Sequence, residues 1–184
     1  MEEDYVVVSS IPILIAPDRR LKTRCKQIDE VDDSIRRRLD EMLVTMYEAP
    51  GIGLAGPQIG DERRLVVIDV AREGDPPAPM KLVNPEVTWF SDETCLMSEG
   101  CLSIPDVYYD VKRPERVKFT YLDETGTERE KEADGLLARC VQHEIDHLNG
   151  ILFIDHVSML KRNMALTKMK KLKAQRAGKR TLRD

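Results

Sequence analysis

The run His143-Glu144-Ile145-Asp146-His147 constrains this chain more than any other feature. Residues four apart in an α-helix lie one turn apart on the same face, so a helix would let both imidazoles reach one metal ion. Glu144 would then lie beside the ion without being a ligand, which is the position of a general base in metal-assisted hydrolysis. Two of the three histidines in the chain fall in this pattern. The run therefore predicts a metal-binding helix with a hydrolytic centre.

The hydrophobic pattern around this run predicts an α+β fold. A helical period extends from Gly135 to Asn149-Gly150, and another begins at Asp32-Asp33-Ser34 and stops at Ala49-Pro50-Gly51. Between them lie short apolar or alternating runs separated by turn residues, which are typical of strands: 65–68, 81–83, 87–90 and 117–122. Strands that cluster between helices favour α+β over alternating βαβ units.

Composition is that of a globular domain, with 184 residues, 41% hydrophobic and 34% charged. No apolar run reaches the roughly 18 residues that a membrane span needs. The acidic start Met1-Glu2-Glu3-Asp4 lacks the features of a signal peptide. We therefore expect no membrane partner and a cytoplasmic location, with a mature protein inside an organelle as the alternative.

Charge is distributed unevenly along the chain. Residues 157–184 hold ten Lys or Arg and one acid, whereas residues 1–156 hold 19 basic and 32 acidic residues. Apolar residues recur among the basic ones, so we expect an amphipathic helix over about residues 157–176. Its Lys/Arg face is expected either to be solvated or to contact anionic RNA. Residues 1–176 would then form a single catalytic domain, and residues 177–184 a disordered basic tail.

A catalytic metal site needs a third protein ligand besides the two histidines. The extended zincin spacing is absent, because the downstream His156 lies nine residues after His147. Downstream acids such as Asp155 keep an ordinary zincin protease open as an alternative.

Among the four cysteines, Cys101 is favoured as the third ligand. Gly100 and Pro105 flank it and predict a non-repetitive backbone that can point a thiolate inward and leave a main-chain N–H free. Cys140 precedes His147 by seven residues, which is about 10 Å along a helix. We expect Cys140 to pack beside the site rather than to bind the ion.

Three motifs are together similar to those of the peptide deformylase family. They are Gly51-Ile52-Gly53-Leu54-Ala55-Gly56-Pro57-Gln58, Glu99-Gly100-Cys101-Leu102-Ser103 and Gln142-His143-Glu144-Ile145-Asp146-His147. With Asn84-Pro85 and Gly150-Ile151-Leu152-Phe153, the resemblance covers about residues 12–170. It implies antiparallel sheets packed around a central metal-binding helix, plus an N-terminal and a C-terminal helix. It also implies an enzyme of protein biosynthesis, which removes the N-formyl group from the initiator methionine of nascent polypeptides and releases formate.

The resemblance implies a role for each matching position. Cys101, His143 and His147 would bind one divalent metal ion, whose bound water is the nucleophile. Glu144 would be the general acid/base. The side chain of Gln58 and the main-chain N–H of Leu102 would hold the formyl oxygen. The family implies Fe(II) as the physiological ion, with zinc, nickel or cobalt in purified protein, whereas coordination rules alone favour zinc.

Other residues are expected to contact the N-formylmethionyl peptide. Glycines of the 51–60 loop would let the substrate backbone approach closely. Three residues on the helix face of His143 would either line the methionine pocket or pack in the core. The expected substrate-binding residues are Ile52, Gly53, Glu99, Gly100, Leu136, Arg139 and Cys140. Glu99 is also expected to pair with Arg113 and so to hold the Cys101 segment.

One position departs from the family pattern, and two other functions stay open. The family usually has a second alanine where this chain has Gly56, and we expect a looser Gln58 loop, with an effect on rate. The alternatives are an endopeptidase with an extended cleft, and an RNA- or ribosome-binding module with a structural metal. In bacterial members of the family a comparable C-terminal helix docks on the ribosome near the peptide exit.

Overall fold

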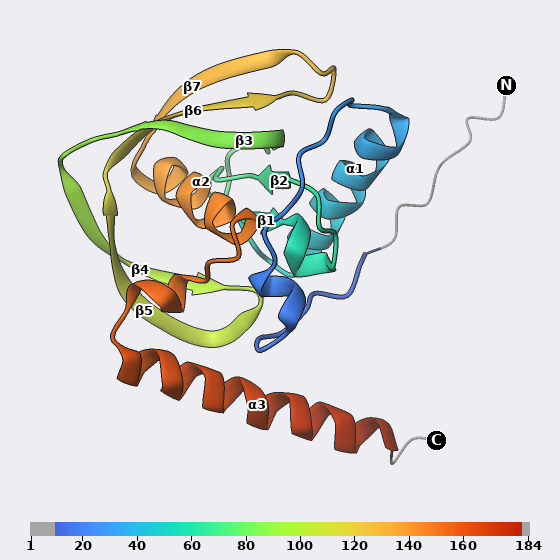
Figure 1. Cartoon of the computed structure of the whole chain (residues 1–184), viewed down its shortest axis with the longest axis vertical. Helices are drawn as coiled ribbons and strands as arrows, with labels where there is room; N and C mark the ends of the chain where they lie inside the picture. The colour runs from blue at the N-terminus through green and yellow to red at the C-terminus, as the bar shows by residue number, and fades with distance from the viewer. Residues whose placement is uncertain (1–9, 182–184) are drawn as a thin grey trace, which may run out of the picture.

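The structure, a computed structural model, describes residues 10–181, in which helix α2 lies between two β-sheets (Figure 1). One antiparallel sheet has the strand order β1-β2-β3-β6-β7, and β4 pairs with β5 in a separate hairpin. The strands are β1 (Gly53–Ala55), β2 (Leu65–Ile68), β3 (Met80–Phe90), β4 (Thr94–Cys101), β5 (Ile104–Pro114), β6 (Arg116–Leu122) and β7 (Glu128–Asp134). The helices are α1 (Asp33–Glu48), α2 (Gly135–Leu148) and α3 (Met159–Thr181), with 3-10 turns η1 (Arg19–Lys22), η2 (Gly56–Ile59) and η3 (Phe153–His156). The predicted α+β fold is confirmed.

Helices α1 and α2 follow the sequence pattern closely. The Asp32 side chain accepts a hydrogen bond from the N–H of Ile35 (2.9 Å), which caps the start of α1. The apolar stripe of α1 is buried against β1, β2 and β3. Helix α2 packs its own apolar residues on the other face of this sheet, against β2, β3 and β6. The sheet therefore has a buried helix on each face, and α2 is the one that also faces the β4–β5 hairpin (Figure 1).

The Asn84-Pro85 segment does not end a strand as its sequence suggests. Strand β3 continues through it, with a register shift between Val83 and Glu86. Asn84 has a φ of 53°, and its side chain accepts from the N–H of Ile28 (2.9 Å) and donates to the C=O of Ile28 (2.7 Å). The proline is therefore accommodated in a bulge, where it interrupts the ladder only locally.

The sequence did not predict the β4–β5 hairpin, and it also missed the strands β1 and β7. Its register breaks between Glu99 and Cys101, and Cys101 then pairs with Ile104 across the turn. A Cβ built on Gly100 would lie 2.5 Å from Cε1 of Tyr108, so a side chain at this position would require the Tyr108 ring to move. The irregular backbone expected around Cys101 is therefore a strand end with a bulge, followed by a two-residue turn.

Helix α3 lies along the bottom of the molecule in Figure 1 and packs on β5 and η3 through its buried Ala165 and Met169. It extends beyond the predicted end near residue 176, because residues 177–181 are mostly compatible with a helix. Residues 182–184 of the expected disordered tail lie outside the described residues. No helix in the described part of the chain is both long and apolar enough to cross a membrane.

Candidate metal centre

Two histidines of α2 and the last residue of β4 meet between the sheets. Cys101, His143 and His147 each offer one ligand atom, and these atoms all lie within 4.8 Å of one another. Sγ of Cys101 is 3.3 Å from Nε2 of His147. One thiolate and two imidazoles are a donor set that suits zinc and other first-row divalent ions. Within the described residues, no other group of three or more His, Cys, Asp or Glu side chains is placed so that it could hold a metal ion.

The remaining candidates for the third ligand lie elsewhere. Sγ of Cys140 is 3.6 Å from the C=O of Ile52, which places it beside the centre, as the helix spacing predicts. His156 contacts Asp146 instead, with Nε2 at 2.7 Å from Oδ2. Asp155 is paired with Lys22 and Arg162 near the surface. The structure thus gives no support to a downstream zincin-type ligand.

The environment of the cluster fits a bound cation. Burial and the neighbouring charge of His143 lower the pKa of His147, which keeps its imidazole in the neutral form that binds metal. Oε2 of Glu144 is buried and has no hydrogen-bond partner among the protein atoms. A buried carboxylate oxygen without a partner is costly, so it is expected to face a water or other ligand when the centre is filled.

Glu144 is 4% exposed, and burial raises its pKa to about 7. A carboxyl group with a pKa near the working pH suits both acceptance and donation of a proton. A Cβ on Gly53 would overlap Oε1 of Glu144 and lie 2.8 Å from Sγ of Cys140. Gly53 was expected to make room for the substrate backbone, and the structure shows that it also makes room for the Glu144 carboxylate.

The amide of Gln58 is oriented by its surroundings. Its Oε1 accepts from the N–H of Ala55 (2.9 Å), so its Nε2 faces Sγ of Cys101 (3.6 Å) and Oγ of Ser103 (3.3 Å). Two backbone hydrogen bonds from the N-terminal segment hold the turns that carry Gln58 and Ser103. Leu14 N–H donates to Gln58 C=O (2.7 Å), and Ala16 N–H donates to Ser103 C=O (2.9 Å). No pattern in the sequence predicted these two backbone contacts.

Gly56 is packed closely, contrary to the looser loop that we expected. A Cβ at this position would lie 2.7 Å from the carbonyl oxygen of Arg63 and 2.8 Å from that of Asp61. The N–H of Asp61 also donates to the C=O of Gly56 (2.9 Å). The backbone of the following loop therefore occupies the place that an alanine methyl would take.

Glu99 links the hairpin to α2, and its carboxylate is 6% exposed. It accepts from Nε (2.6 Å) and Nη2 (3.0 Å) of Arg113, as the sequence predicted, and also from Arg139. Its Oε2 lies 3.2 Å from Nδ1 of His143. A carboxylate on the second nitrogen of a metal-binding histidine fixes the orientation of the ring. Glu99 and Arg139 thus border the site with their charged groups turned to each other.

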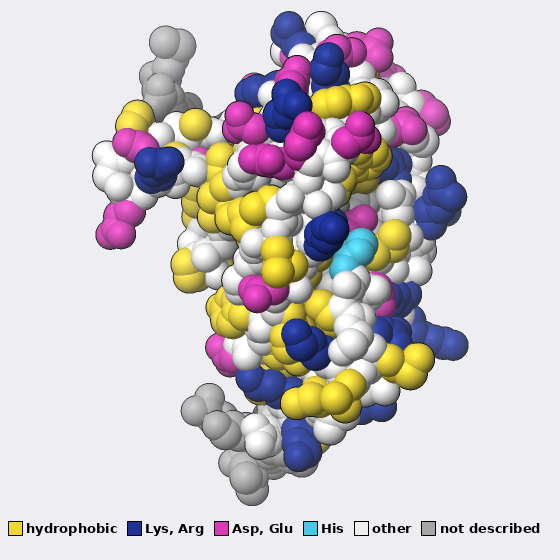
Figure 2. Space-filling view, turned by 90° about the vertical axis from the view of Figure 1, so that its left-hand side faces the viewer, with side chains coloured by type: hydrophobic (Ala, Val, Ile, Leu, Met, Phe, Trp, Pro, Cys, Tyr) yellow, Lys and Arg dark blue, Asp and Glu magenta, His cyan; other side chains and the backbone are white. Residues whose placement is uncertain are grey.

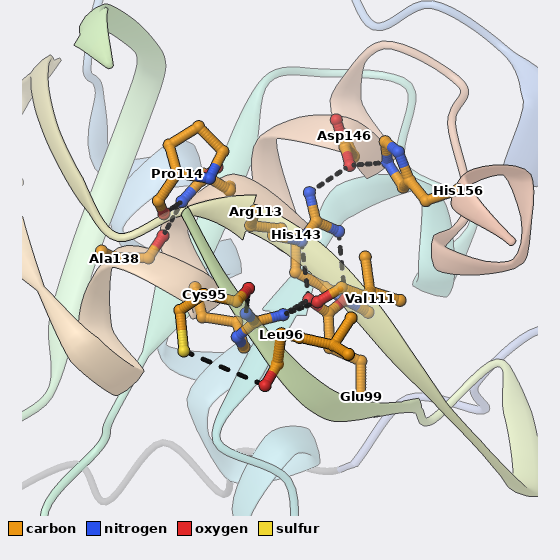
Figure 3. Close-up of polar contacts among 12 residues, drawn as sticks. Cys95, Leu96, Glu99, Val111, Arg113, Pro114, Ala138, His143, Asp146 and His156 are labelled. Carbon is orange, nitrogen blue, oxygen red and sulfur yellow. Dashed lines mark hydrogen bonds and ion pairs between the residues drawn. The ribbon is translucent and has the colours of Figure 1, made fainter. Parts of the chain in front are cut away.

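The same network continues to the molecular surface (Figure 3). Arg113 donates from Nη1 to Oδ2 of Asp146 (2.8 Å), which His156 also contacts. Burial alone would raise the pKa of Glu99, but hydrogen bonds from His143 and Arg113 and the charge of Arg113 outweigh it and lower the pKa to about 2. Glu99 is therefore ionised throughout the physiological range.

A cavity of about 430 Å³ opens over the centre, within the usual size range of small-ligand sites. Every residue predicted for the site lines it except His147, which is buried behind the others. The predicted residues that line it are Ile52, Gly53, Gln58, Glu99, Gly100, Cys101, Leu102, Leu136, Arg139, Cys140, His143 and Glu144. The sequence missed the residues from the start of β5, above all Asp106 and Tyr108. Recognition of β5 as a strand would have placed these two on one face.

Comparisons with known proteins agree with this centre. A family model described as polypeptide deformylase matches residues 10–163. A peptide deformylase of Brucella suis biovar 1 is 52% identical over 171 residues, which cover 93% of this chain and 98% of that protein. A peptide deformylase of Methylocella silvestris is 55% identical over 163 residues, which cover 87% of this chain and 83% of that protein.

Solved structures are similar over most of the chain. The crystal structure of peptide deformylase from Ehrlichia chaffeensis has a TM-score of 0.87 and 38% identity, covering 92% of this chain and 99% of that one. A class I type b peptide deformylase from Acinetobacter baumannii, whose crystal structure is Met-Ala-Ser bound, has a TM-score of 0.77 and 35% identity, covering 82% and 99%.

Proposed function

The chain belongs to the polypeptide deformylase family, whose members remove the N-formyl group from the initiator methionine, and we propose that Glu144 is the general acid/base of this hydrolysis. One observation carries the proposal. The partnerless Oε2 of Glu144, the amide of Gln58 and the thiol of Cys101 belong to residues that line one cavity.

In the proposed mechanism, Cys101, His143 and His147 hold a divalent ion. When bound, such an ion lowers the pKa of a water molecule and polarises a carbonyl oxygen. Glu144 takes a proton from the water that attacks the formyl carbon. It then passes that proton to the amine nitrogen as the C–N bond breaks, which yields formate and a peptide with a free amine.

Two donors are proposed to stabilise the negative charge that develops on the formyl oxygen. Gln58 presents Nε2 toward the Cys101 end of the cavity, because Ala55 holds the other end of its amide. Leu102 is the first residue of the β4–β5 turn, where a main-chain N–H takes no part in the ladder. Each donor aimed at a developing oxyanion is worth about 3 kcal/mol.

The methionine side chain is proposed to lie against Ile52, Leu136 and Cys140. All three line the cavity, and the first two are large apolar side chains that remain 43% and 45% exposed. Apolar surface left uncovered beside a polar centre is typical of a ligand pocket. The crystal structure of the Acinetobacter baumannii relative is Met-Ala-Ser bound, and this tripeptide begins with a methionine.

Three further proposals rest on the resemblance. We infer Fe(II) as the physiological ion, although the donor set also suits zinc, nickel and cobalt. We infer a cytoplasmic location. We also infer contact between α3 and the ribosome near the exit tunnel, since Figure 2 shows basic and hydrophobic side chains at the α3 end and acidic ones gathered toward the opposite end.

Formate release from formyl-Met-Ala-Ser, with and without a chelator, tests the function. Glu144→Gln should keep the metal and lose turnover, whereas Cys101→Ala should lose the metal. Cys95→Ala is the matched control, because Cys95 lies on the same strand and does not line the cavity. Absence of formate from metal-replete protein would refute the proposal. Cleavage of internal bonds would favour an endopeptidase, and metal binding without any turnover a structural metal.

A further inference from the structure

Another cavity, of about 610 Å³, lies on a different face of α2 from the metal centre. Four residues of α2 line it at spacings of three and four, which places them on one side of the helix: Gln142, Ile145, Asp146 and Asn149. Its other walls are residues 24–27, Arg64 and parts of β3 and β5. We call it the Arg64 cavity. It is larger than the cavity over the metal centre, and the proposed hydrolysis does not use it.

Arg64 brings an uncompensated positive charge to this cavity. Its side chain is 7% exposed, and its Nη1 and Nη2 donate to Oδ1 of Asn149 (3.0 Å) and to the C=O of Pro85 (2.9 Å). Both acceptors are neutral, and the buried Nε has no hydrogen-bond partner. Asn149 caps the C-terminus of α2, where the helix dipole offers only about half a negative charge. A buried guanidinium without an opposing charge is costly, so the site favours an anion.

Most other ionisable groups of the Arg64 cavity supply no free negative charge. Asp146 accepts from Arg113 (2.8 Å), and its Oδ2 also lies 2.7 Å from Nε2 of His156 (Figure 3). Its carboxylate is therefore already engaged by two partners. Cys25 is buried, and burial raises the pKa of its thiol to about 11, so this group is neutral at physiological pH.

The charges that remain around the cavity are predominantly positive. Arg24 and Lys112 line it and are exposed, as is Glu86 on β3. None of these three, nor Arg64, makes an ion pair within 4.0 Å with a side chain in the described part of the chain. Three basic groups thus face one acid, which leaves an excess of two positive charges. A phosphate group carries up to two negative charges and accepts hydrogen bonds from a guanidinium in a fork.

We propose that the Arg64 cavity binds a phosphate group, with Arg64 in its wall and Arg24 and Lys112 at its rim. The N–H groups of Arg64 that are not used by Asn149 and Pro85 donate to the phosphate oxygens, and the two exposed cations complete the neutralisation. The phosphate is either the free anion or part of a nucleotide. In a nucleotide the base stacks on Phe90, which lines the same cavity and is 51% exposed.

Equilibrium dialysis of the metal-replete enzyme against radiolabelled inorganic phosphate, at constant ionic strength, tests the proposal. Binding should saturate at one phosphate per chain. Arg24→Gln and Lys112→Gln should each weaken it about two- to fivefold, as expected for exposed charges. Glu86→Gln should strengthen it by a similar factor, because it removes the opposing charge. Lys26→Gln is the matched control for Arg24→Gln, since Lys26 is an exposed cation of the same segment that does not line the cavity.

Arg64→Gln should abolish the binding. If this buried substitution unfolds the chain, the rim variants still decide, because their side chains are exposed. Phosphate held at the metal centre would bind the Arg24 and Lys112 variants as tightly as the wild type. That result, or the absence of saturable binding by the wild type, would overturn the proposal. Formate release by the rim variants should equal that of the wild type, so a failure here is distinguishable from failure of the proposed function.

Two further ligands distinguish the sources of the phosphate. Adenosine monophosphate should bind more tightly than inorganic phosphate if the occupant is a nucleotide, and Phe90→Ala should remove only that advantage. Equal binding of the two identifies the free anion. Adenosine, which lacks the phosphate, should not bind in either case, and binding of adenosine as tight as that of the monophosphate would refute recognition through the phosphate.

Discussion

Replacement of Glu99 by glutamine should affect stability, metal affinity and rate together. Glu99 is the carboxylate on which Arg113, Arg139 and His143 converge. Glutamine keeps the shape of the side chain and removes its charge. The variant would leave Arg139 buried without a charge partner, and it would leave Arg113 with Asp146 alone. It would also replace the group that orients the ring of His143.

The size of the effect follows from the pKa of Glu99. A carboxyl whose pKa falls from 4.5 to about 2 on folding contributes about 3 kcal/mol of stability at neutral pH. Removal of one partner from a buried ion pair typically costs about 3–5 kcal/mol, which agrees with the stability obtained from the pKa. For a chain of this length, 3 kcal/mol corresponds to a fall in Tm of roughly 6–12 °C. Loss of a carboxylate behind a metal-binding histidine lowers metal affinity about 10- to 100-fold.

The assay is thermal unfolding of the metal-free wild type and Glu99→Gln as a function of pH, with metal affinity measured by chelator competition. A carboxyl group whose pKa is lowered by folding stabilises the fold at pH values above its pKa in the unfolded state. The difference between the two proteins should therefore be complete above pH 4.5 and should shrink as pH falls toward 2. Glu93→Gln is the control, because Glu93 forms a long and exposed pair with Arg116 and should change stability by less than about 0.5 kcal/mol.

Three results would refute the reasoning. If Glu99→Gln unfolded at the same temperature as the wild type, the buried network would be neutral to folding. If the variant were less stable but bound metal with unchanged affinity, Glu99 would stabilise the hairpin without orienting His143. A difference in stability that persisted unchanged to pH 2 would contradict the assigned pKa.

Three other predictions follow from the centre. Gly53→Ala should retain metal and lower kcat about 100-fold, because its Cβ would displace the Glu144 carboxylate; an unchanged kcat would show that Glu144 can relocate without loss. Gly56→Ala should lower the free energy of unfolding in urea by about 1–3 kcal/mol, since its Cβ would press on the Arg63 carbonyl; equal or greater stability would mean that the loop gives way. Removal of the ion by a chelator should abolish formate release, and anaerobic addition of Fe(II) should restore it; activity that persisted without metal would exclude the proposed mechanism.

The parts of the site that the sequence predicted are those whose spacing is local. His143 and His147 lie one helical turn apart, so the fold of α2 alone brings them together. Cys101 was identified by its flanking residues and by elimination, and the Glu99–Arg113 pair by charge. These features depend on side-chain chemistry, which the sequence displays directly.

The parts that it missed depend on backbone contacts between distant segments. The N–H groups of Leu14 and Ala16 fix the turns that carry Gln58 and Ser103, but any non-proline residue has an N–H group. Strand β4 has a single buried position, Glu99, so it lacks the alternating pattern that reveals a half-buried strand. The close packing of Gly56 depends on two carbonyl groups of the following loop, and the sequence shows nothing of their position.

The balance of buried charge at this centre favours the binding of a cation. Arg113 and Arg139 are matched by Glu99 and Asp146 through the contacts of Figure 3 and the Arg139 ion pair. A Cys101 thiolate would face the imidazoles of His143 and His147, and neither Cys101 nor Glu144 forms an ion pair with a Lys or Arg side chain among the described residues. Burial is the largest of the effects that raise the pKa of Glu144 to about 7, so about half of this carboxyl is still protonated at neutral pH. A divalent cation held by Cys101, His143 and His147 would stabilise the thiolate and would favour the ionised form of Glu144, which is the form that the proposed mechanism uses as the base.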